Sequence, residues 1–322
     1  MTASKGSGTK VAIGKEASWG TSHVDTLLLP FSSESIAVTV KKTEEPNLLG
    51  GKAVTAFDLM QFSVSGDISG LFKPEVAGYL VWAALGGTDT ITNPSSTYCH
   101  TIIAQTAALA LPSYTIFVDR KVAIKKYTGC KINSLKITSK MGDYTTFAVS
   151  YKGKDEATAT IATSTPPSLK AYKLVNGTLT MGATAFDISG CDLTITNDLD
   201  DGVQVNTSGI YSTEPIHGTR IFELNIDMPY ETNSETLWTT NFITETLLST
   251  VVLHLESPSI ITAALKYRMD VTLSNVAVLD QKRNVSGKDI IGMTIKCVAT
   301  SVGATEPISV AVYDATSAAY SA

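Results

Sequence analysis

The chain has 322 residues, of which 43% are hydrophobic and 17% are charged. This length predicts two domains or one large all-β domain, and the scarcity of charge indicates that much of the surface is covered in the working state. The net charge of −5 and the isoelectric point near 5.4 exclude a protein that grips nucleic-acid phosphates through a basic surface. The same charge balance is compatible with a protein past which nucleic acid moves without being bound.

Targeting and redox signals are absent from the sequence. The N-terminal stretch has no apolar run long enough for a signal peptide, and no segment reaches the roughly 20 apolar residues of a membrane span, so we expect no membrane association. The cysteines lie far apart without Cys-x-x-Cys spacing, and we expect reduced, partly buried thiols. They are Cys99, Cys130, Cys191 and Cys297.

Residues 62–87, FSVSGDISGLFKPEVAGYLVWAALGG, join a strand to a helix. Up to Ser69, apolar and polar residues alternate, which is typical of a strand with one buried and one wet face. From Pro74 to Leu85 the alternation is lost. Pro suits a first helical turn and the two following glycines suit a helix end, so we predict a helix over these residues.

A similar unit stands at residues 221–247, where a second alternating strand precedes a second predicted helix. Asn233 or Ser234 is expected to cap this helix, and Trp238 and Phe242 share one face at a spacing of four.

Other segments repeat in the same order, with an offset of about 155 to 160 residues. Residues 33–45 resemble 189–201, and the hairpin predicted at 130–153 resembles that at 271–299, although the second copy lacks a counterpart of 88–112. The sequence therefore predicts two related β domains, each flanked by a helix. The expected boundaries are an N-terminal arm at 1–32, domains at 33–160 and 171–322, and a proline-containing linker at 161–170.

Two long loops are predicted at matching places, residues 43–57 and 197–220. Loops of this length are uncommon in compact domains and are usually functional or disordered. Both contain apolar residues that a disordered segment would lack, which favours docking against a partner.

The residues that could carry chemistry are scattered. The four histidines lack metal-ligand spacing, and the acidic run Asp198, Asp200, Asp201 lacks the glutamate that a calcium loop needs at its twelfth position, which is Gly209. Nucleophile and phosphate-binding motifs are also missing. We expect neither enzymatic activity nor a cofactor or metal.

The N-terminal region resembles the major tail tube proteins of long-tailed (siphovirus-type) bacteriophages. The matching elements are Gly14-Lys15-Glu16, Trp19-Gly20-Thr21, Leu29-Pro30-Phe31 and Ser33-Glu34-Ser35. The likeness continues in residues 63–87, 127–138, 149–156 and 211–220, and departs mainly at 88–112 and after Glu306.

This resemblance implies a duplicated β-sandwich or partial barrel with its helix outside the inner sheet. It also implies a structural virion protein, assembled in the host cytoplasm, whose rings stack into a tube for DNA ejection. With two domains per chain, three chains would make a pseudo-sixfold ring. Tape measure, tail terminator and baseplate proteins would be its partners, and DNA would pass without specific binding. A terminator or baseplate hub ring protein and a carbohydrate-binding β-sandwich remain alternatives.

Two sets of residues follow as expectations. The wet strand faces would line the channel and repel phosphates; they comprise Ser63, Ser65, Asp67, Ser69, Glu223, Asn225 and Asp227. The two long loops would join successive rings, through Glu44, Glu45, Leu48, Leu49, Asp198, Asp200, Tyr211 and Arg220.

Overall fold

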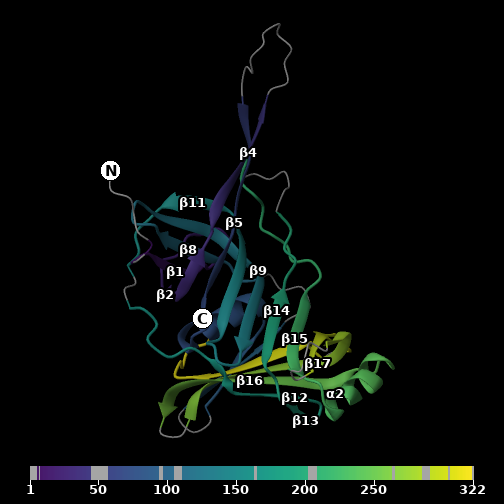
Figure 1. Ribbon diagram of the computed structural model, residues 1–322. Coiled ribbons are helices and arrows are strands. Elements are labelled where there is room, and N and C mark those ends of the chain that lie inside the picture. Colours follow the sequence, from purple (N-terminus) through teal and green to yellow (C-terminus); the bar gives the residue numbers. More distant parts are fainter. Residues whose placement is uncertain are drawn as a thin grey trace.

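The computed structural model describes residue 6 and residues 8–44, 57–93, 97–104, 111–162, 165–201, 209–262, 265–284, 291–303 and 305–320. Within these ranges the fold is mainly β, as the sequence predicts, with helices confined to two places (Figure 1).

The strands up to residue 158 are β1 (Lys10–Lys15), β2 (Leu27–Leu28), β3 (Phe31–Glu34), β4 (Ala37–Glu44), β5 (Phe57–Leu71), β6 (Asp89–Thr92), β7 (Tyr98–Ile103), β8 (Tyr114–Asp119), β9 (Ile124–Lys140), β10 (Thr146–Gly153) and β11 (Asp155–Thr158). Those after residue 170 are β12 (Lys173–Met181), β13 (Thr184–Phe186), β14 (Gly190–Thr196), β15 (Ile221–Pro229), β16 (Leu248–Thr262), β17 (Leu265–Asn284), β18 (Gly292–Ala299) and β19 (Ile308–Asp314). The helices are α1 (Pro74–Leu85) and α2 (Thr232–Thr236), and α2 continues as the π-helical turn η1 (Leu237–Phe242).

Eight antiparallel strands form what we call the main sheet. Their order is β4, β5, β10, β9, β14, β15, β18 and the second half of β17. The strands β9 and β14 come from the two predicted domains, yet they pair directly over seven residues, from Gly190 opposite Lys140 to Thr196 opposite Ser134. The main sheet therefore runs without interruption through both halves of the chain.

Two of these strands are long enough to enter a further layer. The first half of β9 pairs with β8 and β11, and β8 pairs with β1. The first half of β17 pairs with β16 and β19, and β19 pairs with β7 from the first half of the chain. We call β12, β16, β17, β19 and β7 the second sheet. The predicted domain boundaries remain a prediction, and strand pairs cross them in both sheets.

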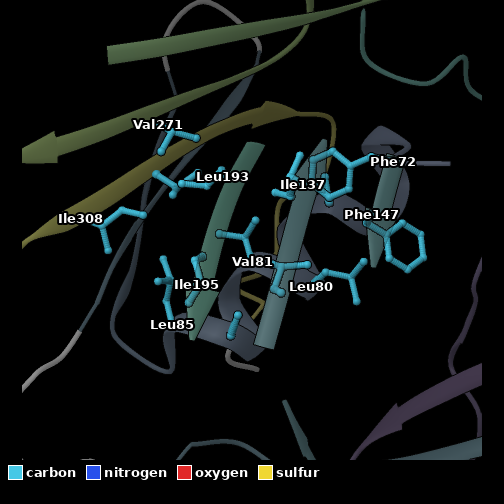
Figure 2. Packing of buried hydrophobic residues seen from close by; sticks show 14 of the residues in the cluster. Phe72, Leu80, Val81, Leu85, Ile137, Phe147, Leu193, Ile195, Val271 and Ile308 are labelled. Atoms are coloured by element: carbon cyan, nitrogen blue, oxygen red, sulfur yellow. The ribbon is translucent and has the colours of Figure 1, made fainter. Parts of the chain in front are cut away.

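The helix α1 lies in the core between the two sheets. Leu80 and Val81 point toward Ile137 and Leu193 of the main sheet, while Val271 and Ile308 belong to the second sheet (Figure 2). The bounds of α1 agree with the prediction, including the left-handed Gly86 that ends it. The helix does lie on the side of the main sheet away from the polar residues. It is buried there rather than at the outer surface, because the second sheet covers it.

The second predicted helix begins earlier than expected. Its N-cap is Glu231, and the expected cap Ser234 sits in the first turn, where its hydroxyl accepts a hydrogen bond from the Glu231 N–H at 2.7 Å. Ser234 thus satisfies the backbone N–H of Glu231 from inside the helix. Glu231, whose backbone is extended, takes the cap position. Trp238 and Phe242 do share one face, with stacked rings 4.7 Å apart.

Candidate assembly and channel surface

The residues predicted to line a channel lie together on one face of the main sheet. In antiparallel pairs, residues directly opposite each other point to the same side. One such row crosses five strands and contains Ser69, Ala148, Lys136, Thr194 and Glu223. The other predicted residues alternate with buried neighbours on β5 and β15, as expected. We call this surface the polar face.

Two lysines of the polar face are paired with carboxylates across strands. The ammonium of Lys136 lies 3.0 Å from the Asp192 carboxylate, and that of Lys296 lies 2.6 Å from Glu223. Asn225 donates a further hydrogen bond to Glu223 at 2.7 Å. Burial acts to raise the pKa of Glu223, but the hydrogen bonds from Lys296 and Asn225 outweigh it, and the pKa lies below its ordinary value. The face thus combines small hydroxyl side chains with ion pairs. Asp67 and Lys140 also lie on it, exposed and without an ion pair among the described residues.

The outer ends of β4 and β5 form a two-stranded arm, residues 38–44 and 57–62, that extends beyond the rest of the molecule (Figure 1). Thr43, Glu44 and Phe57, expected in a loop, belong to these strands. The arm exposes apolar side chains, with Phe57 63% and Met60 51% exposed. A two-stranded ribbon is marginally stable alone in water, so such an arm fits a protein that packs against a partner.

Of the residues predicted to contact a neighbouring ring, Glu44 is exposed at the described end of the arm. Glu45, Leu48 and Leu49 lie outside the described residues.

Residues 210–212 of the second predicted loop lie at the base of the arm. The Phe62 N–H donates to the carbonyl of Ile210 at 2.8 Å, and the Ser212 N–H donates to the carbonyl of Phe62 at 3.2 Å. The ring of Tyr211 meets that of Phe62 edge-on at 5.4 Å. Tyr211 from the second half of the chain therefore packs against the arm, which belongs to the first half.

The acidic residues of this second segment are exposed. Asp198 adopts a left-handed backbone conformation, and the carboxylate of Asp200 accepts a hydrogen bond from the Ile216 N–H at 2.9 Å. They form an acidic turn beside the arm.

Arg220 acts inside the chain. Its guanidinium donates to the carbonyls of Ala84 and Leu85, each at 2.9 Å, and to the side-chain oxygen of Asn197 at 2.8 Å. It thereby satisfies the last carbonyls of α1, which have no partner within the helix. Burial lowers the pKa of Arg220 to about 10.

The Gly-Lys-Glu element near the N-terminus has a structural role that sequence reasoning missed. The buried carboxylate of Glu16 accepts hydrogen bonds from Ser113 (2.7 Å), Thr115 (2.8 Å) and the backbone N–H groups of Gly20 and Gly129 (2.9 Å each). Glu16 directly follows β1, and three of its four donors come from distant parts of the chain.

In the described part of the chain, no group of three or more His, Cys, Asp or Glu side chains could hold a metal ion. All four cysteines are buried and free, and burial raises the pKa of Cys191 and Cys297 to about 12 and that of Cys130 well above its ordinary value. Such thiols stay protonated and are poor nucleophiles.

Among the described residues, no helix has the length and hydrophobicity of a membrane span.

Comparisons with known proteins identify the family. No match is found among curated proteins. The family model described as "Phage tail tube protein" matches residues 6–309, which is nearly the whole chain. The chain therefore belongs to the phage tail tube protein family, a family of structural virion proteins.

Proposed function

We propose that copies of this chain assemble into stacked rings whose polar faces line the channel through which DNA leaves the capsid. One observation carries the proposal. The main sheet is continuous across both halves of the chain, buried against α1 on one side and covered by short polar side chains and paired charges on the other.

The chemistry of the polar face suits a moving polyanion. DNA phosphates are held in place by Lys and Arg side chains that have no carboxylate partner. On this face Lys136 and Lys296 each lie in contact with a carboxylate, so their charge is already neutralised. DNA would meet mainly hydroxyl groups, carboxylates and paired lysines, with Lys140 as an exposed lysine that forms no ion pair in the described part of the chain.

The ring would contain three chains. The two halves of the chain each contribute four neighbouring strands to the main sheet, so three copies would give a pseudo-sixfold wall. Joining sheets edge to edge also removes exposed strand edges, which otherwise pair without control.

Successive rings would stack through the arm and the neighbouring acidic segment. Exposed apolar side chains at the arm, together with Leu48 and Leu49 from the sequence between β4 and β5, would anchor the contact. The charges of Glu44, Glu45, Asp198 and Asp200, with Tyr211 at the base of the arm, would set the rotational register. Arg220 supports this region from inside the chain by holding the end of α1.

In the virion the tube would end on terminator and baseplate proteins and enclose a tape measure protein, with assembly in the host cytoplasm. The protein would be structural and would need no cofactor.

Electron microscopy of the purified protein tests the proposal. Tubes with a threefold, pseudo-sixfold cross-section are expected. Single rings that never elongate would indicate a terminator or hub, and true sixfold rings of whole chains would contradict the trimer. Cysteines introduced at Asp67 and Asp227 locate the channel. In tubes they should react with small reagents and resist bulky ones, whereas a cysteine at Val122, which is 83% exposed and off the polar face, should react with both.

A further inference from the structure

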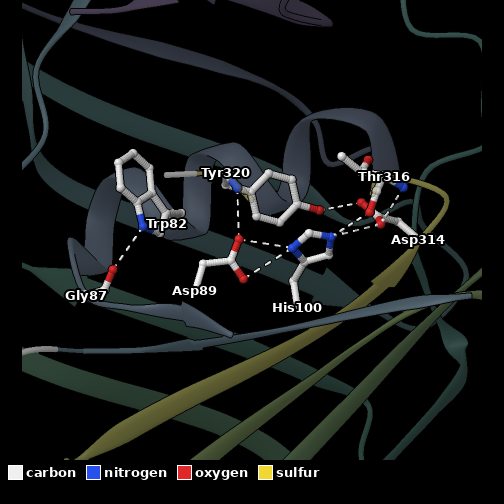
Figure 3. Close-up of polar contacts among 7 residues, drawn as sticks. All are labelled: Trp82, Gly87, Asp89, His100, Asp314, Thr316 and Tyr320. Atoms are coloured by element: carbon white, nitrogen blue, oxygen red, sulfur yellow. Dashed lines mark hydrogen bonds and ion pairs between the residues drawn. The ribbon is translucent and has the colours of Figure 1, made fainter. Parts of the chain in front are cut away.

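The segment that follows β19, residues 315–320, lies against α1 and ends in a buried tyrosine (Figure 3). Tyr320 is 2% exposed. Its ring fills the space beside Gly78, where any side chain would overlap it, and lies 4.8 Å from the ring of Tyr79. We call residues 315–320 the strap. The glycine at the point of contact shows that α1 is shaped to receive it.

Two buried carboxylates fasten the strap. Asp89 accepts the backbone N–H of Tyr320 at 2.8 Å, and Asp314 accepts both the Tyr320 hydroxyl and the backbone N–H of Thr316. Because Asp89 belongs to β6, these contacts join the strap to a distant hairpin as well as to α1.

A fully buried histidine, His100, lies between the two carboxylates. Its Nδ1 is 3.0 Å from the Asp89 carboxylate, and its Nε2 is 2.8 Å from the carbonyl oxygen of Thr316 in the strap. The ring of His100 also lies 4.4 Å from that of Tyr320. Both ring nitrogens therefore face atoms that can only accept hydrogen bonds.

This geometry requires two N–H donors, which only the imidazolium form has. If the proton is lost, the remaining N–H is expected to stay with the carboxylate, because charged acceptors form the stronger bond. The Nε2 lone pair would then face the Thr316 carbonyl, and the strap would lose an attachment. We propose that the strap is a proton-dependent closure over α1, held shut while His100 is doubly protonated and loosened when it becomes neutral.

The surroundings of His100 support this direction. The groups that face it in the described part of the chain are Asp89 from β6, Asp314 from the end of β19, and Thr316 and Tyr320 from the strap, with Tyr79 of α1 beyond Tyr320. Burial acts to lower the pKa of His100, but hydrogen bonds to Asp89 and Thr316 and the charges of both aspartates outweigh it and raise the pKa. Burial also raises the pKa of Tyr320 and Tyr79, so neither ionises near neutral pH.

The sign of the pH effect follows from linkage. A histidine whose pKa is raised in the closed state stabilises that state fully below its ordinary pKa of about 6.5. The stabilisation is lost as the pH rises through the closed-state value. Across that window the ratio of open to closed strap increases by at most about tenfold for each pH unit.

Hydrogen exchange of the full-length protein tests the proposal without any need for tubes. Protection of residues 315–320, corrected for the intrinsic pH dependence of exchange, is measured from pH 6 to 9. Wild-type protection should fall by several-fold or more above pH 6.5, and Tyr320→Phe should lower protection at every pH while keeping that fall. His100→Gln should give weak protection that does not change with pH.

His254→Gln is the matched control, because His254 also pairs with an aspartate, Asp270, but on the second sheet away from the strap. It should behave like wild type. Wild-type protection that is constant over the range, or an unchanged pH dependence in His100→Gln, would overturn the proposal. If His100→Gln does not fold, the wild-type and His254→Gln profiles still decide it.

Discussion

Lys136 and Asp192 lie on adjacent strands from the two halves of the chain, and their charged atoms are 3.0 Å apart on the polar face. Both side chains are partly exposed, at 48% and 31%, so the pair contributes little to folding, about 0.2 to 1 kcal/mol. Its importance under the proposed function is that it neutralises a lysine where DNA passes.

The first prediction removes that neutralisation. Asp192→Asn together with Glu223→Gln should leave folding and tube formation intact but leave Lys136 and Lys296 without their carboxylates. The tubes should then retain DNA fragments in a salt-dependent way, with log K falling by about 0.9 per decade of salt for each phosphate contacted. Filter retention at several salt concentrations measures this. Adding Lys136→Gln and Lys296→Gln should abolish retention; if the quadruple variant still binds, the lysines are not responsible.

A second prediction concerns acid. The pKa of Glu223 is lowered in the folded state, so its stabilising contribution is present above the ordinary carboxyl pKa and is lost as the pH falls through the lowered value. Wild type should exceed Glu223→Gln in stability by at most about 1 kcal/mol at pH 7, since the pair is partly exposed. The two proteins should converge toward pH 3. Urea denaturation at each pH provides the comparison, and a gap that widens in acid would contradict this assignment.

The third prediction tests the end of α1. Arg220→Met keeps the length of the side chain but leaves the carbonyls of Ala84 and Leu85 without their donor. A loss of about 2 to 3 kcal/mol in the free energy of unfolding is expected. Lys282→Gln, whose side chain is 71% exposed, should change it by less than about 0.5 kcal/mol. Equal effects in both variants would show that Arg220 is not a structural cap.

The arm gives the fourth prediction. Phe57→Ser with Met60→Ser, or Leu48→Ser with Leu49→Ser, should give folded rings that no longer elongate, because interface anchors contribute on the order of 2 kcal/mol each. Light scattering follows elongation, and Val122→Ser serves as the control because it removes an exposed apolar side chain elsewhere. Elongation at the wild-type rate in both arm variants would remove the arm from the stacking surface.

Local signals made part of this structure predictable. The bounds of α1 follow from Pro74 and Gly86, and the two faces of β5 and β15 follow from strict alternation. Phe57, the first residue of β5, was expected in a loop. The neighbouring Leu59 and Met60 are exposed like Phe57, so the sequence there shows no alternation of apolar and polar residues.

Contacts between distant residues could not be predicted in this way. Arg220 and Ala84, or His100 and Tyr320, meet only because the sheets bring separate segments together. His100 was judged isolated because its carboxylate partners lie on other strands. The structural role of the Glu16 carboxylate likewise becomes clear only from the four hydrogen bonds that it accepts in the folded chain.

The direct pairing of β9 with β14 has a mechanical consequence. Because seven consecutive residue pairs join the two halves of the chain, no hinge separates them within the main sheet. A force that bends a tail would have to shear this ladder of backbone hydrogen bonds to deform a single subunit. In the proposed assembly, bending should therefore concentrate at the contacts between rings that the arms would make, and each ring should keep its bore while the tail curves.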